Sequence, residues 1–390
     1  MTIQEVQTTQ QARTFLAVHV DLNRHEHGFI RPLDKDVEQV FDPEKNKSFR
    51  QGKACRWLLL DENGKAVGRI AAFTNRKYKN KGDQQATGCF GFFDCRNKPE
   101  EAALLLHTAR IWLEKMGMQA MDGPVNFGER DRFWGLLVDG FEAPPYGMNF
   151  NPPYYESLLT SAGFRPFYNQ ICYRRPVQDA LPQRFLDVHK KLKETGIYRA
   201  DRVRLGDWKR YARDFCTVYN KAWAKHEGNK EMPQEQAIKI FKAMKPIMDE
   251  DIAWFVYAHD EPVAMYLNIP DLNQIFRHFN GKLGWFEKLR LLWYLKRRTC
   301  TRFVGIIFGI TPEHQGMGVD KFMVVEAAQV IQSRTRYQET ELQWIGDFNP
   351  KMIQIAKELE FEQSRTLTVF RLLFDPEQPF NRHPILGSAS

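Results

Sequence analysis

One segment of the chain, residues 303–326 with the sequence FVGIIFGITPEHQGMGVDKFMVVE, constrains the fold more than any other. Its apolar beginning at residues 303–310 predicts a central strand that is buried on both faces. Gly316 and Gly318 then allow a tight turn, and residues 316–333 have the periodicity of a helix. Backbone N–H groups at such a helix start lack partners within the helix and attract anions. The turn is therefore either a phosphate cradle or a plain connector, and both interpretations stay open.

The first half of the chain alternates between strand-like and helix-like segments. Residues 53–60 and 66–74 flank Asp61-Glu62-Asn63-Gly64, a sequence typical of a hairpin turn. After this hairpin we expect a strand at 87–94, a helix at 100–116, a strand at 118–125, a helix at 154–162 and a strand at 167–173.

The second half repeats this order. Two helices at 206–226 and 233–248 precede a hairpin formed by residues 252–258 and 262–269. The strand, helix, strand, helix and strand that follow are expected at 303–310, 316–333, 341–345, 350–359 and 366–373. We therefore predict an α/β chain of layered α+β type with two tandem domains, each a mixed, mostly antiparallel sheet flanked by helices. The prolines at 176 and 182 indicate the boundary, giving domains at 1–178 and 183–375 and a polar tail at 376–390.

The turn PEHQGMGVD resembles the pyrophosphate loop of the GNAT (N-acetyltransferase) superfamily, in which Gln/Arg-x-x-Gly-x-Gly/Ala is usual. Gln315 matches the first position and Gly318 the fourth. FGFFDC, GPVNF, LLVDGF, NPPYYESLLTSAGF, PDLNQ and ELQWIGDFN are similar to a bacterial branch with two such domains, so the resemblance spans roughly residues 15–374. It implies a cytoplasmic N-acyltransferase that passes an acyl group from acetyl-CoA or a longer acyl-CoA directly to an amine.

The resemblance also implies which residues hold the donor. The loop amides would bind the CoA diphosphate and the end of the preceding strand the pantetheine arm. The implied cofactor-binding residues are Ile310, Thr311, Gln315, Gly316, Met317, Gly318, Val319, Asp320, Lys321 and Asn349. The first half has no glycine pair after its strand at 87–94, so its cofactor loop is degenerate and we expect no CoA there.

Two positions depart from the family pattern. Asp320 places a carboxylate beside the expected diphosphate, and Ala356 stands where many members carry a tyrosine that protonates the CoA thiolate. Water or another group must then supply that proton, or the chain is a catalytically inactive GNAT-fold ligand-binding protein.

The amine needs a base, and the strand at 303–310 carries no carboxylate. The nearby candidates are Glu313, His314 and Asp347, of which histidine titrates nearest to neutral pH. Each has a structural alternative: His314 as a solvated turn residue, and Asp347 as the cap of the helix at 350–359.

Residues 270–302 form an insertion that bears on the acceptor. In the resembling branch, Asp271 and Asn273 would edge the acceptor pocket. Residues 284–302 then combine an apolar stripe with basic residues that contribute to the net charge of +8. Three interpretations of such a helix stay open. It lies flat on the surface of an anionic membrane, it covers an apolar acyl chain as a lid, or it packs on the core of the domain. A lipid-amine N-acyltransferase at the membrane surface is therefore one alternative. An aminoacyl-tRNA donor is another, although the chain carries no nucleic-acid-binding motif.

Six scattered cysteines form no CxxC pair, which predicts buried reduced thiols and no metal site. The N-terminus lacks the apolar core of a secretory signal, and no apolar run approaches the roughly 18 residues of a membrane span.

Overall fold

The computed structural model describes residues 1–223 and 231–386. The predicted end of the long helix at residues 224–226 and the last residues of the tail lie outside this range. No helix in the described part of the chain is long and apolar enough to cross a membrane. All six cysteines are free thiols, as predicted, and only Cys55 is not fully buried.

The first half contributes seven strands and four α-helices to the described residues. The strands are β1 (Thr2–Glu5), β2 (Gly52–Leu60), β3 (Ala66–Asn75), β4 (Thr87–Cys95), β5 (Ala120–Gly123), β6 (Leu136–Asp139) and β7 (Arg165–Pro176). The helices are α1 (Thr9–Asn23), α2 (Asp34–Val40), α3 (Pro99–Lys115) and α4 (Tyr155–Ser161).

The second half has the same alternation. Its strands are β8 (Tyr198–Arg202), β9 (Ala253–Ala258), β10 (Glu261–Pro270), β11 (Arg302–Ile310), β12 (Glu339–Gly346) and β13 (Glu362–Leu373). Its helices are α5 (Gln183–Glu194), α6 (Trp208–Trp223), α7 (Gln234–Met244), α8 (Asn273–Phe276), α9 (Trp285–Lys296), α10 (Val319–Ser333) and α11 (Pro350–Glu358).

Every helix and strand that the sequence predicts is present, with ends shifted by a few residues. Seven elements were not predicted from the sequence: β1, β6, β8, α1, α2, α5 and α8. For α1 a signal was available, because Thr8 and Gln11 form a capping box at its start. The buried apolar residues of this helix are Phe15, Leu16 and Val18, and its first turn is mostly polar. For this reason the start of the helix shows no apolar pattern in the sequence.

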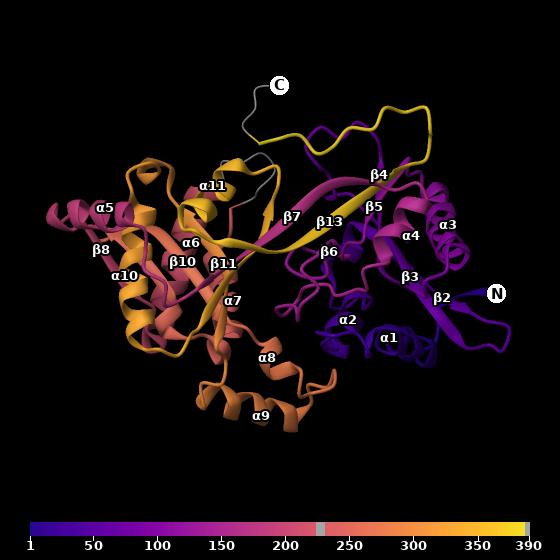
Figure 1. Cartoon of the computed structure of the whole chain (residues 1–390), viewed down its shortest axis with the longest axis horizontal. Helices are drawn as coiled ribbons and strands as arrows, with labels where there is room; N and C mark the ends of the chain where they lie inside the picture. The colour runs from indigo at the N-terminus through magenta and orange to yellow at the C-terminus, as the bar shows by residue number, and fades with distance from the viewer. Residues whose placement is uncertain (224–230, 387–390) are drawn as a thin grey trace.

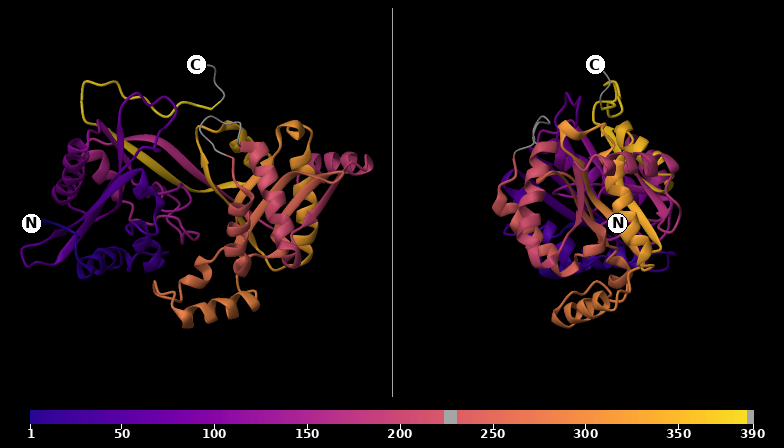
Figure 2. Two further views of the ribbon diagram at one scale, coloured as in Figure 1. Left: turned by 180° about the vertical axis from the view of Figure 1, so that it is seen from behind. Right: turned by 90° about the vertical axis from the view of Figure 1, so that its left-hand side faces the viewer.

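All thirteen strands of the described residues join one mixed sheet in the order β1-β2-β3-β4-β5-β13-β7-β12-β11-β10-β9-β8, with β6 paired to β13. Only the pairs β4–β5 and β11–β12 are parallel among the pairings of the described residues. Figures 1 and 2 show β7 and β13 running side by side across the middle of the molecule.

The two halves exchange strands at this centre. The last strand of the chain, β13, pairs with β5 of the first half, whereas β7 of the first half pairs with β12 of the second. A buried ion pair supports the exchange, since Arg371 of β13 donates from Nε to Asp122 of β5 at 2.6 Å. The division at residues 178 and 183 stays a prediction, and the sheets of the two halves are interlocked.

Each half is a three-layer sandwich. In the first half, α3 and α4 cover one sheet face and α1 the other. In the second half, α10 packs against Trp254 and Tyr266 on one face, while α6 and α7 cover the opposite face. The insertion with α8 and α9 lies outside these layers, at the lower edge in Figure 1.

Candidate acyl-donor site

The strands β11 and β12 separate in front of the glycine turn. They pair from Arg302 with Glu339 up to Gly305 with Leu342, and within the described residues they continue without further pairing to each other. A bulge in β12 accompanies the separation, because its register on β7 shifts after Leu342 and Trp344 has a φ of 55°. The prediction that residues 303–310 are buried on both faces is wrong for the outer half, where Ile306 is 44% exposed. The reason is that this half of β11 has lost its neighbour on one edge.

The two glycines of the turn have different structural roles. Gly316 has a φ of 76° and Gly318 a φ of 84°, so both occupy the left-handed region that favours glycine. A Cβ atom on Gly318, the N-cap of α10, would stand 2.5 Å from Cγ1 of Val188 in α5. A Cβ atom on Gly316 would meet nothing within 4 Å. Gly318 is thus needed for packing, whereas Gly316 faces open space.

Side chains of the turn hold its shape. Gln315 donates from Nε2 to the carbonyl of Ile310 at 3.0 Å, which closes the loop back onto β11. The Thr311 amide donates to Val263 of β10 at 2.9 Å. Thr311 Oγ1 lies 3.1 Å from Nδ1 of His314. These hydrogen bonds of Gln315 and Thr311 are therefore all made within the turn or to β10 and β11. The side chain of Met317 is 56% exposed.

The carboxylate of Asp320 has a cationic neighbour. Lys321 Nζ lies 3.0 Å from Asp320 Oδ2 and 3.3 Å from Glu358 Oε2 of α11. An ion pair at this distance offsets much of the repulsion that Asp320 would exert on a bound phosphate.

An apolar pocket with a volume of about 80 Å³ lies between α10 and α11 over the base of the separating strands. Its lining includes Phe303, Phe308, Ala327, Ile331, Ile355 and Leu359. Hydroxyl groups come from Thr340, whose Oγ1 is buried, and from Tyr266, whose pKa burial raises to about 12. Ala356 is fully buried against Tyr173 and Ile345, so α11 supplies no phenol at that position.

The predicted bases have different surroundings. Glu313 is exposed, and the ring of His314 stands edge-on to Tyr198 with centroids 5.9 Å apart. Asp347 is paired with Arg382 of the tail at 2.7 Å. The cap of α11 is Asn349 rather than Asp347, because Asn349 Oδ1 accepts from the Met352 amide at 3.4 Å.

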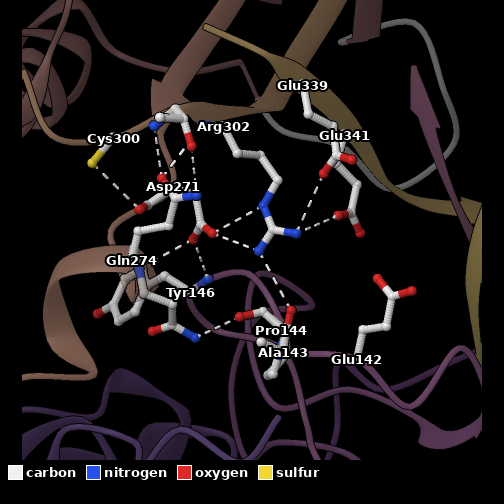
Figure 3. A network of polar contacts seen from close by, with 12 residues as sticks. Glu142, Ala143, Pro144, Tyr146, Asp271, Gln274, Cys300, Arg302, Glu339 and Glu341 are labelled. Carbon is white, nitrogen blue, oxygen red and sulfur yellow. Dashed lines mark hydrogen bonds and ion pairs between the residues drawn. The ribbon is translucent and has the colours of Figure 1, made fainter. Parts of the chain in front are cut away.

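The predicted acceptor residues Asp271 and Asn273 are both buried. Figure 3 shows Asp271 within a network of polar contacts between the halves. Asp271 Oδ2 accepts from Nη2 of Arg302 at 2.7 Å, and its Oδ1 accepts from the Tyr146 amide at 3.2 Å. Asn273 donates from Nδ2 to the Pro144 carbonyl at 2.8 Å. Both side chains therefore fasten the loop before α4 to the insertion, and their predicted contact with a substrate stays a prediction.

Comparison with known proteins identifies two relatives that share most of their length with this chain, although no family model matches it. The chain is 23% identical over 372 residues to a bacterial ceramide synthase from Caulobacter vibrioides, covering 94% of this chain and 95% of that protein. Protein YghO from Escherichia coli is 23% identical over 308 residues, covering 77% of each chain.

Two solved structures share the fold. A tandem GNAT protein from the clavulanic acid biosynthesis pathway superposes with a TM-score of 0.54 at 10% identity, covering 97% of this chain and 99% of that one. The GCN5-related glucosamine N-acetyltransferase region of a fungal multi-domain protein gives a TM-score of 0.54 at 10% identity, and the match spans 38% of that longer chain. The chain therefore has a tandem GNAT fold, which confirms the fold that the glycine turn and the repeated element order predicted.

Proposed function

We propose that this chain is an N-acyltransferase that transfers the acyl group of an acyl-CoA to a lipid amine at a membrane surface. The observation that carries this proposal is the separation of β11 and β12 immediately before the glycine turn of α10. Separated strands leave backbone groups and space for an extended thioester arm. The adjoining helix start supplies unpaired amides for its diphosphate.

The helix start of α10 favours an anionic donor. Its macrodipole presents partial positive charge to the turn between Gln315 and Lys321. The charge of Lys321 further compensates Asp320 at 3.0 Å. Gly316, with no atom near its missing side chain, lets a phosphate approach the backbone closely.

The apolar pocket favours a long acyl chain over acetyl. Its lining between α10 and α11 is almost entirely aliphatic and aromatic. Burial of each CH₂ group contributes about 0.8 kcal/mol, so a fatty acyl chain gains far more from such a lining than a two-carbon group does.

The insertion favours a lipid acceptor. One face of α9, with Leu291, Tyr294 and Leu295, packs against α8. The opposite face leaves five large apolar side chains exposed: Trp285 (75%), Phe286 (63%), Leu289 (47%), Leu292 (50%) and Trp293 (51%). Exposed lysines and arginines at 288 and 296–298 accompany them, a combination suited to an anionic lipid surface.

The relative from Caulobacter vibrioides adds a chemical class, since it is described as a ceramide synthase. A ceramide is the amide of a fatty acid and a long-chain amino alcohol. A long apolar donor, an amine acceptor and a membrane surface are the three features that this chemistry requires. We therefore propose a long-chain amino alcohol as the acceptor.

A second candidate function is ligand binding without catalysis. It is favoured by buried Ala356, which stands where the family carries its thiolate acid. In that case acyl-CoA would bind without turnover.

Calorimetric titration with palmitoyl-CoA, acetyl-CoA and CoA tests the proposal, with Gly316→Asp as the variant. The new carboxylate would stand in the amide cradle, so we expect wild-type affinity to be lost. Gly64→Asp is the matched control, because Gly64 also has a φ of 76° and open space around its Cβ position. It imposes the same backbone strain in the β2–β3 turn and should leave affinity unchanged. Gly318 is unsuitable, because any side chain there meets Val188.

Incubation of the wild type with palmitoyl-CoA and an amino alcohol, followed by mass detection of the amide, then separates the two candidates. Amide formation supports the transferase, and binding of palmitoyl-CoA without amide formation supports the ligand-binding protein. In the calorimetric experiment, equal affinity of Gly316→Asp and Gly64→Asp for palmitoyl-CoA would refute the placement of the donor at the glycine turn.

A further inference from the structure

A second pocket lies in the first half, where β4 and β5 separate. These strands pair from Thr87 with Ala120 to Cys89 with Asp122, and β4 continues to Cys95. The pocket has a volume of about 50 Å³, and its lining includes His19, Asp94, Pro124, Met148 and Phe150. It thus occupies the same place in the first half that the donor site occupies in the second, without a glycine turn beside it.

The pocket contains a histidine held by a buried carboxylate. Nδ1 of His19 lies 3.0 Å from both oxygens of Asp94. The carboxylate also accepts from Arg69 Nε at 2.5 Å, from the Tyr155 hydroxyl at 3.0 Å and from Asn23 Nδ2 at 3.2 Å. Burial alone would raise the pKa of Asp94, but the charges and hydrogen bonds of His19 and Arg69 outweigh it and hold that pKa well below its usual range.

This arrangement leaves one ring nitrogen of His19 for a ligand. When the imidazole is neutral, this ionised carboxylate, which only accepts hydrogen bonds, selects the tautomer with the proton on Nδ1. Nε2 then keeps its lone pair. The His19 side chain is 13% exposed while Asp94 is 2% exposed, so the imidazole stands between a buried anion and the pocket.

Aromatic contacts connect His19 to the second half. The ring of His19 is 5.4 Å from that of Phe29, which is 5.9 Å from Phe150. Phe150 and Trp344 belong to one apolar cluster, and Trp344 lies on β12 at the bulge beside the donor opening. These contacts form a continuous row of aromatic side chains from His19 to β12, the strand that borders the proposed donor site.

Two buried polar atoms at this junction have no partner among the described residues. They are Nε1 of Trp344 and Oε1 of Gln170, a β7 residue that is 1% exposed. Gln170 stands opposite Leu367, which belongs to the same cluster as Phe150, so its side chain points to that side of the sheet. A buried polar atom without a partner is costly, so each of these two atoms is available to pair with a bound hydroxyl or amine.

We propose that this pocket binds the polar end of a long-chain amino alcohol, and that His19, positioned by Asp94, removes a proton from its ammonium group. The inference rests on the proposed transferase function and assigns its acceptor side to the first half of the chain. His19 Nε2 takes one proton from the ammonium. The neutral amine attacks the thioester carbon, and the C–N bond forms as the C–S bond breaks. The remaining excess proton on nitrogen passes to the CoA thiolate, while the protonated His19 returns its proton to solvent.

Calorimetry and single-turnover kinetics on the full chain test this assignment. The soluble probe is 2-aminodecane-1,3-diol, with palmitoyl-CoA as the donor. His19→Gln should keep palmitoyl-CoA affinity and lower the rate of amide formation by about 100-fold or more, the usual range for loss of a general base. The pH profile of the rate should differ between the wild type and His19→Gln. The charged and titratable groups that face His19 are Asp94, Arg69 and Tyr155.

Two variants separate catalysis from structure. Free imidazole should partly restore the rate of His19→Ala. His189→Gln is the matched control, because His189 is also buried and contacts a carboxylate, Glu326, at 2.7 Å. It should keep the pH dependence of the wild type.

The outcomes distinguish the two proposals. Retention of the rate and pH dependence by His19→Gln would overturn the role of His19 while leaving the transferase intact. Failure of the wild type to bind the amino alcohol would overturn the pocket assignment. Binding that His19→Gln weakens, without any amide from palmitoyl-CoA, would support the pocket as an amine site and refute the transferase.

Discussion

The exposed face of α9 gives a quantitative test of membrane contact. Replacing Trp285 and Trp293 by serine removes side chains that are 75% and 51% exposed. Because a tryptophan offers up to about 250 Å² of surface, roughly 300 Å² of exposed surface disappears. At about 25 cal/mol per Å², complete transfer of this surface out of water would contribute about 8 kcal/mol. Interfacial helices bury only part of it, so we take half, about 4 kcal/mol.

Since each 1.4 kcal/mol is a factor of ten, this estimate predicts a loss of membrane affinity of about 1000-fold. The assay is sedimentation with phosphatidylcholine vesicles, with and without phosphatidylglycerol. The basic residues at 288 and 296–298 should strengthen binding to the anionic vesicles, by about 1 kcal/mol for each charge near the surface.

The control replaces Ile111 and Ile197 by serine, because they are exposed by 37% and 40% and lie outside α9. This variant should sediment like the wild type. The reasoning is refuted if wild-type protein does not sediment with anionic vesicles, or if both double variants bind equally well.

Two further predictions concern stability. Asp271→Asn removes the buried carboxylate that pairs with Arg302 and should lower the free energy of unfolding, measured in urea, by about 3–5 kcal/mol. Glu339, another carboxylate that pairs with Arg302, is 33% exposed, so Glu339→Gln should lower that free energy by less than about 1 kcal/mol. Equal effects would show that the network does not join the halves. Because the folded-state pKa of Asp94 is lowered, its ion pairs stabilise the fold above its unfolded pKa of about 3.9, and this contribution is lost as the pH falls further. Asp94→Asn should therefore lose less stability than the wild type between neutral and acidic pH, and an equally steep loss in acid would contradict the assignment.

Local patterns in the sequence predicted most of the secondary structure. The apolar run before Gly316 and the Asn63-Gly64 turn each determine their conformation through neighbouring residues. Local patterns overestimated the burial of β11, because Ile306 is as apolar as a core residue and only the separation from β12 exposes it. The start of α1 was predictable from the capping box of Thr8 and Gln11.

The glycine turn could be predicted because its whole geometry lies within one short segment. The function of the individual residues could not. Asp271 is polar in a loop-like segment, which favours a substrate contact, yet its partners Arg302 and Tyr146 come from elsewhere in the chain. Trp285 and Leu291 are both apolar, and only the contact with α8 decides that Leu291 is partly buried while Trp285 is exposed.

The sequence by itself thus determined the repeated order of elements and the glycine turn, because these depend on local periodicity and backbone freedom, and the resemblance of its motifs to the GNAT superfamily implied the tandem GNAT fold. Tertiary structure alone decided the exchange of β7 and β13 between the halves, since strand pairing joins residues far apart in the chain. It also decided the meeting of His19 with Asp94, which are 75 residues apart and belong to different layers. Neither residue has a sequence neighbour that indicates the other, and only the packing of α1 on β4 brings them to one pocket.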